Sequence, residues 1–250
     1  MSRTIRLTVE YDGTAWHGWQ RQDQPVMPTI QQQVEAALAR VLDGPVSIEG
    51  CSRTDAGVHA LAHVSSFVTT RSVACLGILR GCNSYLPDDI AVVGCEDVPD
   101  GFHARFDATG KTYRYSIYNA AVRSPRRHRF SHFEHRPLDA AAMHEAALHL
   151  VGTHDFFSLA TLAKLKETTV RTITRAAVSR RDGDPDMIDI EFDGDGFLYN
   201  QVRTMAGTLL DVGLGRRTTG SIVPLLAARD RKLAGQNLPA CGLTLVAVRY

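Results

Sequence analysis

Apolar and polar residues alternate in several short stretches of the 250-residue chain, and these stretches are separated by segments with apolar residues at helical spacing. The order of these stretches, β-α-β-β-α-β, occurs twice. These two observations predict an α+β fold built from two tandem ferredoxin-like, or RNP-like, halves with antiparallel sheets and helices on one face. We expect the sheets to lie side by side, with a cleft between the halves.

The first half begins with a strand, because apolar residues alternate over 5–11. Thr29 and Gln32 have the spacing of a capping box, and they precede a helical pattern over 30–42 that Gly44-Pro45 ends. The remaining elements of this half are strands near 46–50 and 63–69, a helix over 76–85 and a strand over 90–98.

The second half repeats this order from a strand over 113–117. Its further elements are a helix over 138–151, strands over 173–181 and 187–192, a helix over 198–210, a short extra helix near 219–228 and a final strand over 243–248. The junction has no flexible linker composition. We therefore expect residues 1–105 and 106–250 to dock as two halves of one unit.

Composition narrows the classes of protein that fit. The net charge is +1, so a polyanionic ligand would need local clusters of Lys and Arg rather than global charge. No segment has the apolar length of a signal peptide or a membrane span, which indicates a cytoplasmic protein. The cysteines are odd in number and scattered, which predicts free thiols and neither disulfides nor a zinc site; they are Cys51, Cys75, Cys82, Cys95 and Cys241.

The run Ser52–Ala60, with the sequence SRTDAGVHA, is the strongest candidate for chemistry. Arg53 stands two positions from Asp55, and a cation at that distance would favour the ionised carboxylate. An ionised, positioned carboxylate can act as a nucleophile. Taken alone, the run also fits an ordinary turn in which Asp55 caps a backbone N–H, Gly57 supplies an unusual φ angle and Arg53 is solvated.

The densest positive charge follows the strand over 113–117. The functional interpretation is phosphate binding along RNA, and the alternative is a solvated basic loop. The basic residues are Arg123, Arg126, Arg127, Arg129 and Arg136, with His128, His132 and His135 among them. No Cys or carboxylate completes a metal-ligand set with these histidines, and the segment 192–197 lacks the acidic positions of a calcium loop, so we expect no metal site.

The run Ser52–Ala60 resembles the catalytic loop of the TruA family of tRNA pseudouridine synthases, in which Gly is commoner than Ser at position 52. Four further motifs of that family follow the same order along the chain. They are Tyr11-Asp12-Gly13-Thr14 with Gly18-Trp19-Gln20; His103-Ala104-Arg105-Phe106 with Lys111, Tyr113, Arg114 and Tyr115; Phe197–Arg203 with Met205 and Gly207; and Pro239-Ala240-Cys241-Gly242-Leu243.

The resemblance implies that the chain isomerises uridine to pseudouridine at positions 38, 39 and 40 in the anticodon stem-loop of tRNA. Asp55 is then the nucleophile, and the target base must leave its stack. The bond from ribose to N1 breaks and a bond from ribose to C5 forms. No redox step occurs, so no cofactor is expected. Whether Asp55 attacks ribose C1′ or uracil C6 stays open.

Further site residues are implied by the same resemblance. Tyr113 would stack on uracil or take part in proton transfer at C5, whereas Tyr115 is expected to be a core residue. Arg53 would hold the nucleotide out of its stack, and Arg203 would pair with the nucleophile. Leu245 would line the base pocket or lie in the core. Family resemblance also implies a homodimer that binds tRNA across both subunits, with no part for DNA or a membrane.

Two other classes of protein fit parts of the same sequence. A catalytically silent RNA-binding module could use the same two sheets, but it would not need Asp55 together with Arg53, Tyr113 and Arg203. A carboxylate-based hydrolase would need a second catalytic carboxylate or a metal to activate water, and none is visible near the motif.

Overall fold

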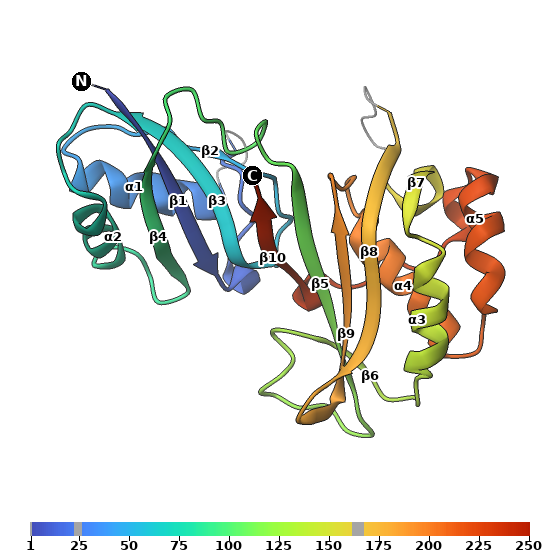
Figure 1. The fold of residues 1–250 in the computed structure, drawn as a ribbon. Coiled ribbons are helices and arrows are strands. Elements are labelled where there is room, and N and C mark those ends of the chain that lie inside the picture. Colours follow the sequence, from blue (N-terminus) through green and yellow to red (C-terminus); the bar gives the residue numbers. More distant parts are fainter. Residues whose placement is uncertain (1, 23–26, 162–167) are drawn as a thin grey trace. The chain divides into compact units, whose positions relative to one another are not determined.

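The computed structural model describes residues 2–22, 27–161 and 168–250, which form a mixed α+β structure (Figure 1). The chain divides into two compact units, Met1–Thr109 with Thr244–Tyr250, and Gly110–Leu243. The observed division therefore falls four residues beyond the boundary expected at 105/106. It also assigns Thr244–Tyr250, nearly all of the last strand, to the first unit rather than to the second.

The sheet of the first unit is centred on β1 (Arg3–Tyr11), which pairs antiparallel with β3 (His59–Thr69) on one side and β4 (Ile90–Val98) on the other. Two short pairings extend β3. Strand β2 (Glu49–Gly50) pairs with it antiparallel, and β10 (Leu243–Arg249) pairs with it in parallel. The alternation expected over 5–11 is confirmed, and every second residue of β1 faces the core.

Helices α1 (Ile30–Val41) and α2 (Cys75–Asn83) lie on one face of this sheet (Figure 1). The apolar stripe of α1 and the inward side chains of β1 form the core of the unit; Ile5, Leu7 and Leu38 are fully buried. The capping box is confirmed, since the Thr29 side chain accepts from the Gln32 N–H while the Gln32 side chain accepts from the Thr29 N–H.

The strand expected near 46–50 is limited to β2, because polar side chains of α1 take the backbone groups of Ile48. The Ile48 N–H donates to Glu35 Oε1 at 3.1 Å, and its carbonyl accepts from Gln31 Nε2 at 3.1 Å. Hydrophobic alternation alone could not anticipate this competition between side-chain and strand hydrogen bonds.

The second unit has an antiparallel sheet in the order β5-β9-β8-β7. Its strands are β5 (Gly110–Asn119), β7 (Gly152–Asp155), β8 (Val170–Arg181) and β9 (Asp184–Gly194), and β6 (His132–Glu134) pairs in parallel with β5. Helices α3 (Ala140–Leu148), α4 (Gln201–Gly213) and α5 (Ile222–Ala228) lie on one side of the sheet (Figure 1).

The structure departs from the expected fold in small elements. The expectation of antiparallel pairing throughout is wrong for β10 with β3 and for β6 with β5. Strands β6 and β7 were not expected, since both are short and mostly polar. Within the described residues, five 3-10 helices connect the larger elements. They are η1 (Gly13–Ala15), η2 (Phe157–Leu159), η3 (Thr219–Ser221), η4 (Arg231–Leu233) and η5 (Ala240–Gly242). Within the same residues, none of the helices has the length and apolar character needed to cross a membrane.

The capping box makes a stability prediction. Thr29→Ala should lower the free energy of unfolding by about 1 kcal/mol, because a first-turn N–H of α1 loses its acceptor. Urea denaturation followed by circular dichroism measures this change. Thr218→Ala is a matched control, since Thr218 precedes η3 without a side-chain cap and is exposed. Equal midpoints for the two variants would contradict the role of Thr29.

Candidate active site

The loop that carries Asp55 connects β2 to β3 and is held by backbone hydrogen bonds on both sides of this residue. The Trp19 N–H donates to the Thr54 carbonyl at 3.1 Å, and the Gly57 N–H donates to the Trp16 carbonyl at 3.3 Å. Inside the loop, the Val58 N–H donates to the Asp55 carbonyl at 3.1 Å. The Asp55 side chain is half-buried. The carboxylate therefore stands on a braced loop, in reach of a ligand.

An aromatic cluster beneath the loop holds it in place. The hydroxyls of Tyr11 and Thr54 share a hydrogen bond of 2.8 Å in the interior. His63 Nε2 lies 2.9 Å from the Ser52 carbonyl, and the His63 ring stacks on Trp19 with a centroid distance of 3.6 Å. Buried hydrogen bonds and stacked rings have few alternative arrangements, so the cluster stabilises the observed conformation of the loop.

Two glycines allow the N-terminal segment to approach the loop. A Cβ on Gly18 would lie 2.3 Å from the Thr54 carbonyl oxygen, and one on Gly13 would lie 2.0 Å from the Val58 carbonyl oxygen. Gly18 also has a φ of +85°, which other residues rarely adopt. The sequence alone indicates no role for the Tyr-Asp-Gly-Thr and Gly-Trp-Gln motifs. In the structure, both motifs support the Asp55 loop.

Arg53 is exposed, between Ser52 and the buried Thr54. Its guanidinium is therefore accessible to a ligand that approaches the Asp55 loop. Leu245 lies on β10 opposite Ala60 and is fully buried. Leu245 thus pairs with the last residue of the Ser52–Ala60 run. Whether its side chain lines a base pocket stays a prediction.

Tyr113 lies on β5 of the second unit, opposite Phe192 of β9, and is 7% exposed. Its ring meets the Phe197 ring edge-on at a centroid distance of 5.2 Å. Tyr115, two residues further along β5, is fully buried and donates its hydroxyl proton to the Pro239 carbonyl at 2.8 Å. Burial raises the pKa of Tyr115 strongly. The assignment of Tyr115 to the core is confirmed.

Arg203 lies in the first turn of α4 and is half-buried. Its Nε donates to the Leu238 carbonyl at 2.6 Å and its Nη1 donates to Asn200 Oδ1 at 3.2 Å. Asn200 precedes the helix with a φ of +62°. These contacts fix the guanidinium. Asp55 and Arg203 belong to different units, and the pairing between them stays a prediction.

The arginines of the basic segment after β5 fall into two groups, those that pair with a carboxylate and those that are exposed. Arg127 is engaged within the second unit, since it donates to Asp184 at 2.5 Å and lies over the Tyr118 ring at 5.2 Å. Arg136 forms a bidentate pair with Glu134, and this hydrogen bonding lowers the pKa of Glu134 to about 2. Arg123, Arg126 and Arg129 are exposed.

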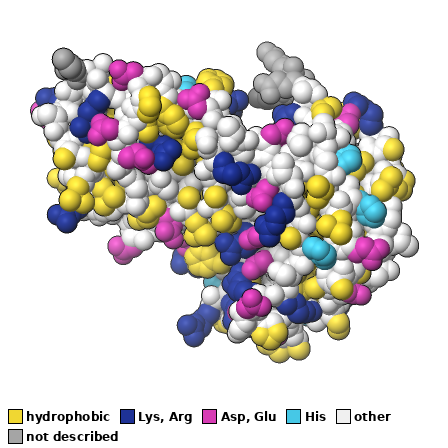
Figure 2. Space-filling view, viewed as in Figure 1, with side chains coloured by type: hydrophobic (Ala, Val, Ile, Leu, Met, Phe, Trp, Pro, Cys, Tyr) yellow, Lys and Arg dark blue, Asp and Glu magenta, His cyan; other side chains and the backbone are white. Residues whose placement is uncertain are grey.

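The strands of the second unit carry cations and anions side by side, as Figure 2 shows over β5, β8 and β9. Arg175 pairs with both Glu191 and Asp193, and Arg181 forms two hydrogen bonds with Asp189. The charges on this face largely compensate each other. A phosphate backbone would gain little from binding there.

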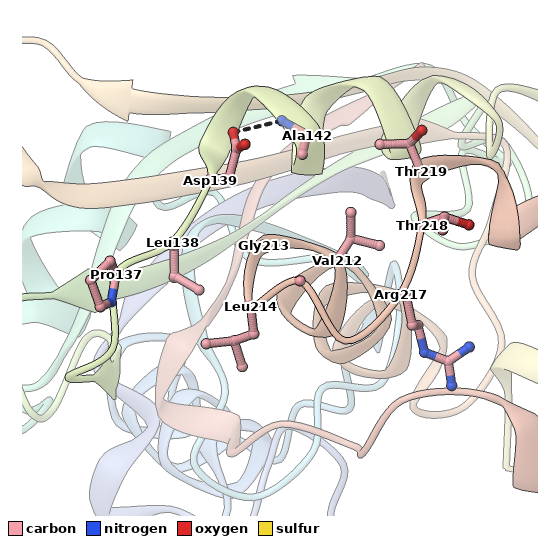
Figure 3. A pocket seen from close by; sticks show the side chains of 11 residues that line it. Pro137, Leu138, Asp139, Ala142, Val212, Gly213, Leu214, Arg217, Thr218 and Thr219 are labelled. Carbon is pink, nitrogen blue, oxygen red and sulfur yellow. Dashed lines mark hydrogen bonds between the residues drawn. The ribbon is translucent and has the colours of Figure 1, made fainter.

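A pocket of about 630 Å³ lies at the start of α3 and the end of α4 (Figure 3). Asp139 caps α3 by accepting from the Ala142 N–H, and Arg217 stands at the rim. None of the site residues expected from the sequence lines this pocket. It is therefore separate from the candidate active site.

A braced, half-buried aspartate on an α+β scaffold is an arrangement that an enzyme with a positioned carboxylate can use. A family model described as tRNA pseudouridine synthase matches residues 7–107 and 146–250. The chain is 46% identical over 248 residues to tRNA pseudouridine synthase A of Pelobacter propionicus, covering 99% of this chain and 100% of that protein. It is 42% identical over 250 residues to tRNA pseudouridine synthase A 2 of Clostridium tetani, covering 100% of both. The chain belongs to the tRNA pseudouridine synthase family, a family of isomerases.

The steric argument about Gly18 makes a prediction. Gly18→Ala should lower kcat/KM about 10- to 100-fold, because the added methyl group displaces the loop that positions Asp55. Steady-state kinetics on a tRNA transcript would measure this decrease. Gly183→Ala is the control: Gly183 has a φ of +73°, but an added Cβ would meet nothing within 4 Å. That variant should lose about 1 kcal/mol of stability and keep its activity. Full activity of Gly18→Ala would contradict the bracing role.

Proposed function

We propose that this tRNA pseudouridine synthase isomerises uridines 38, 39 and 40 in the anticodon stem-loop of tRNA, with Asp55 as the nucleophile and with the target base flipped out of its stack. The observation that carries the proposal is the bracing of the Asp55 loop, in a chain that is similar over its full length to proteins named tRNA pseudouridine synthase A.

The reaction explains why such bracing is useful. The glycosidic bond to N1 breaks, the freed uracil turns, and C5 bonds to the ribose; C5 then loses a proton and N1 gains one. A carboxylate can assist only if it stays within bonding reach of the ring or the sugar, because small displacements slow such steps sharply. A loop with one conformation keeps the Asp55 carboxylate at the reacting atoms without a further ordering cost.

Four residues are assigned to the flipped nucleotide and the nucleophile. We assign Tyr113 to the uracil face, because its ring is fixed by Phe197, and base stacking on an aromatic ring is worth about 1–3 kcal/mol. The Arg203 guanidinium, fixed by Leu238 and Asn200, would pair with the Asp55 carboxylate and keep it ionised. Arg53 would occupy the position that the base vacates, and Leu245 would line the pocket.

The proposal extends to the assembly and its location. A homodimer in the cytoplasm would bind one tRNA across both subunits. With a net charge of +1, the chain would rely on local basic segments, and the exposed Arg123, Arg126 and Arg129 are candidates for phosphate contacts.

Replacement of the nucleophile tests the mechanism. Asp55→Asn and Asp55→Ala should abolish pseudouridine formation while changing the Kd for tRNA by less than about threefold, since the carboxylate acts in a bond-making step. Unmodified tRNA transcripts are incubated with each variant, and pseudouridine is mapped base by base. Asp88→Asn, at an exposed aspartate of the same unit, is the control. Turnover above a few per cent in Asp55→Ala would contradict the nucleophile role, and wild-type product outside 38–40 would contradict the target positions.

Charge reversal in the basic segment tests the RNA path. Arg123→Glu combined with Arg126→Glu should weaken tRNA binding and lower the slope of log K against log[salt] by roughly 0.7–0.9 for each phosphate that the protein no longer neutralises. Fluorescence anisotropy at several salt concentrations measures both quantities. Arg127→Glu is the comparison, because it breaks the pair with Asp184 and should chiefly destabilise the second unit. An unchanged slope in the double variant would remove this segment from the RNA path.

A further inference from the structure

The turn between β4 and β5 presents a large aromatic side chain to solvent. Phe106 is 74% exposed, which is the largest exposed fraction of any aromatic residue in the described part of the chain; Tyr199, with 57%, follows. An isolated exposed apolar residue is common and carries no meaning alone. The construction of the turn, however, shows that this ring is held in place.

His103 organises the turn from inside. Its Nδ1 accepts from the Arg105 N–H at 3.1 Å and from the Phe106 N–H at 3.4 Å. Two hydrogen bonds join His103 and Asp107 and close the turn. The Asp107 N–H donates to the His103 carbonyl at 3.1 Å, and the His103 N–H donates to Asp107 Oδ2 at 2.8 Å. The backbone that carries Phe106 is thereby fixed.

The turn is also anchored to the first unit. Ala104 is fully buried; its N–H donates to Ser66 Oγ of β3 at 3.1 Å, and its carbonyl accepts from the Tyr250 hydroxyl at 2.7 Å. The Tyr250 ring in turn contacts the Phe102 ring at a centroid distance of 5.0 Å. A ring on such an anchored turn loses little conformational entropy when a ligand covers it.

The groups around the exposed ring indicate the chemistry of that ligand. The His103 ring lies 4.3 Å from the Phe106 ring, and the Arg105 guanidinium carbon lies 5.5 Å from its centre. Aromatic rings beside an Arg are the groups on which unpaired nucleobases stack. The Asp107 carboxylate in the same turn would repel a phosphate, which favours contact with a base rather than with the backbone.

We propose that the His103–Asp107 turn is a stacking platform for an unpaired base of the tRNA substrate, with Phe106 as the stacking residue. The platform is separate from the Asp55 loop and would orient the RNA before and during the reaction. This inference rests on the proposed action on tRNA, but it concerns binding and does not depend on which uridines are modified.

Three variants of Phe106 distinguish stacking from simple burial. Phe106→Leu keeps an apolar side chain and removes the aromatic face, so it should raise the Kd for an anticodon stem-loop RNA about 5- to 100-fold. Phe106→Ala should raise it at least as much. Phe106→Trp should bind within about threefold of the wild type, because an indole keeps the stacking face, and its added fluorescence should be quenched by the RNA. Leu76→Ala, at an exposed apolar residue of α2, should leave the Kd unchanged.

The experiment is carried out in the Asp55→Ala background, so that binding is read without turnover. A blunt RNA duplex without unpaired bases is the second ligand, and the effect of Phe106→Leu should disappear with it. A wild-type Kd for Phe106→Leu would overturn the platform even if pseudouridine forms at 38–40. A changed oligomeric state in that variant would also overturn it, since the ring would then belong to a subunit contact. Pseudouridine formed by the wild-type enzyme at positions other than 38–40 would overturn the proposed target and leave the binding result intact.

Discussion

The candidate site depends on one constraint. The backbone of the segment before α1 lies very close to the backbone of the loop before β3. Glycine at positions 13 and 18 removes the side chains that would otherwise strike the Val58 and Thr54 carbonyls. This close approach lets the Trp19 N–H donate to the Thr54 carbonyl, and the Trp19 ring stacks on the His63 ring. Without it, Asp55 would stand on an unsupported connection between a two-residue strand and β3.

Contacts with neighbouring residues also hold other candidate groups of both units in place. In the first unit, the His103–Asp107 turn is anchored through Ala104 to Ser66 and Tyr250. In the second, Arg203 is held by Leu238 and Asn200, and Tyr113 by Phe197. These candidate contacts to RNA thus come from groups whose positions are set before the ligand arrives, which reduces the entropy lost on binding.

The basic residues show how tertiary contacts sort residues that look equivalent in a sequence. Arg127 and Arg126 are neighbours, yet Arg127 pairs with Asp184 and covers Tyr118, whereas Arg126 is exposed. On the strands of the second unit, Arg175 and Arg181 also face carboxylates. Within the basic segment after β5, the exposed arginines are therefore Arg123, Arg126 and Arg129.

The sequence by itself determined the order of the main strands and helices, the capping box at Thr29 and the family, because periodicity and local motifs need no long-range information. It also singled out Asp55, through the run Ser52–Ala60. Only the tertiary structure decided that β10 joins the first unit, that β2 is cut short by Gln31 and Glu35, and that Tyr11, Gly18 and His63 support the Asp55 loop. These outcomes depend on which distant groups meet, and side chains compete for backbone partners only once the chain has folded.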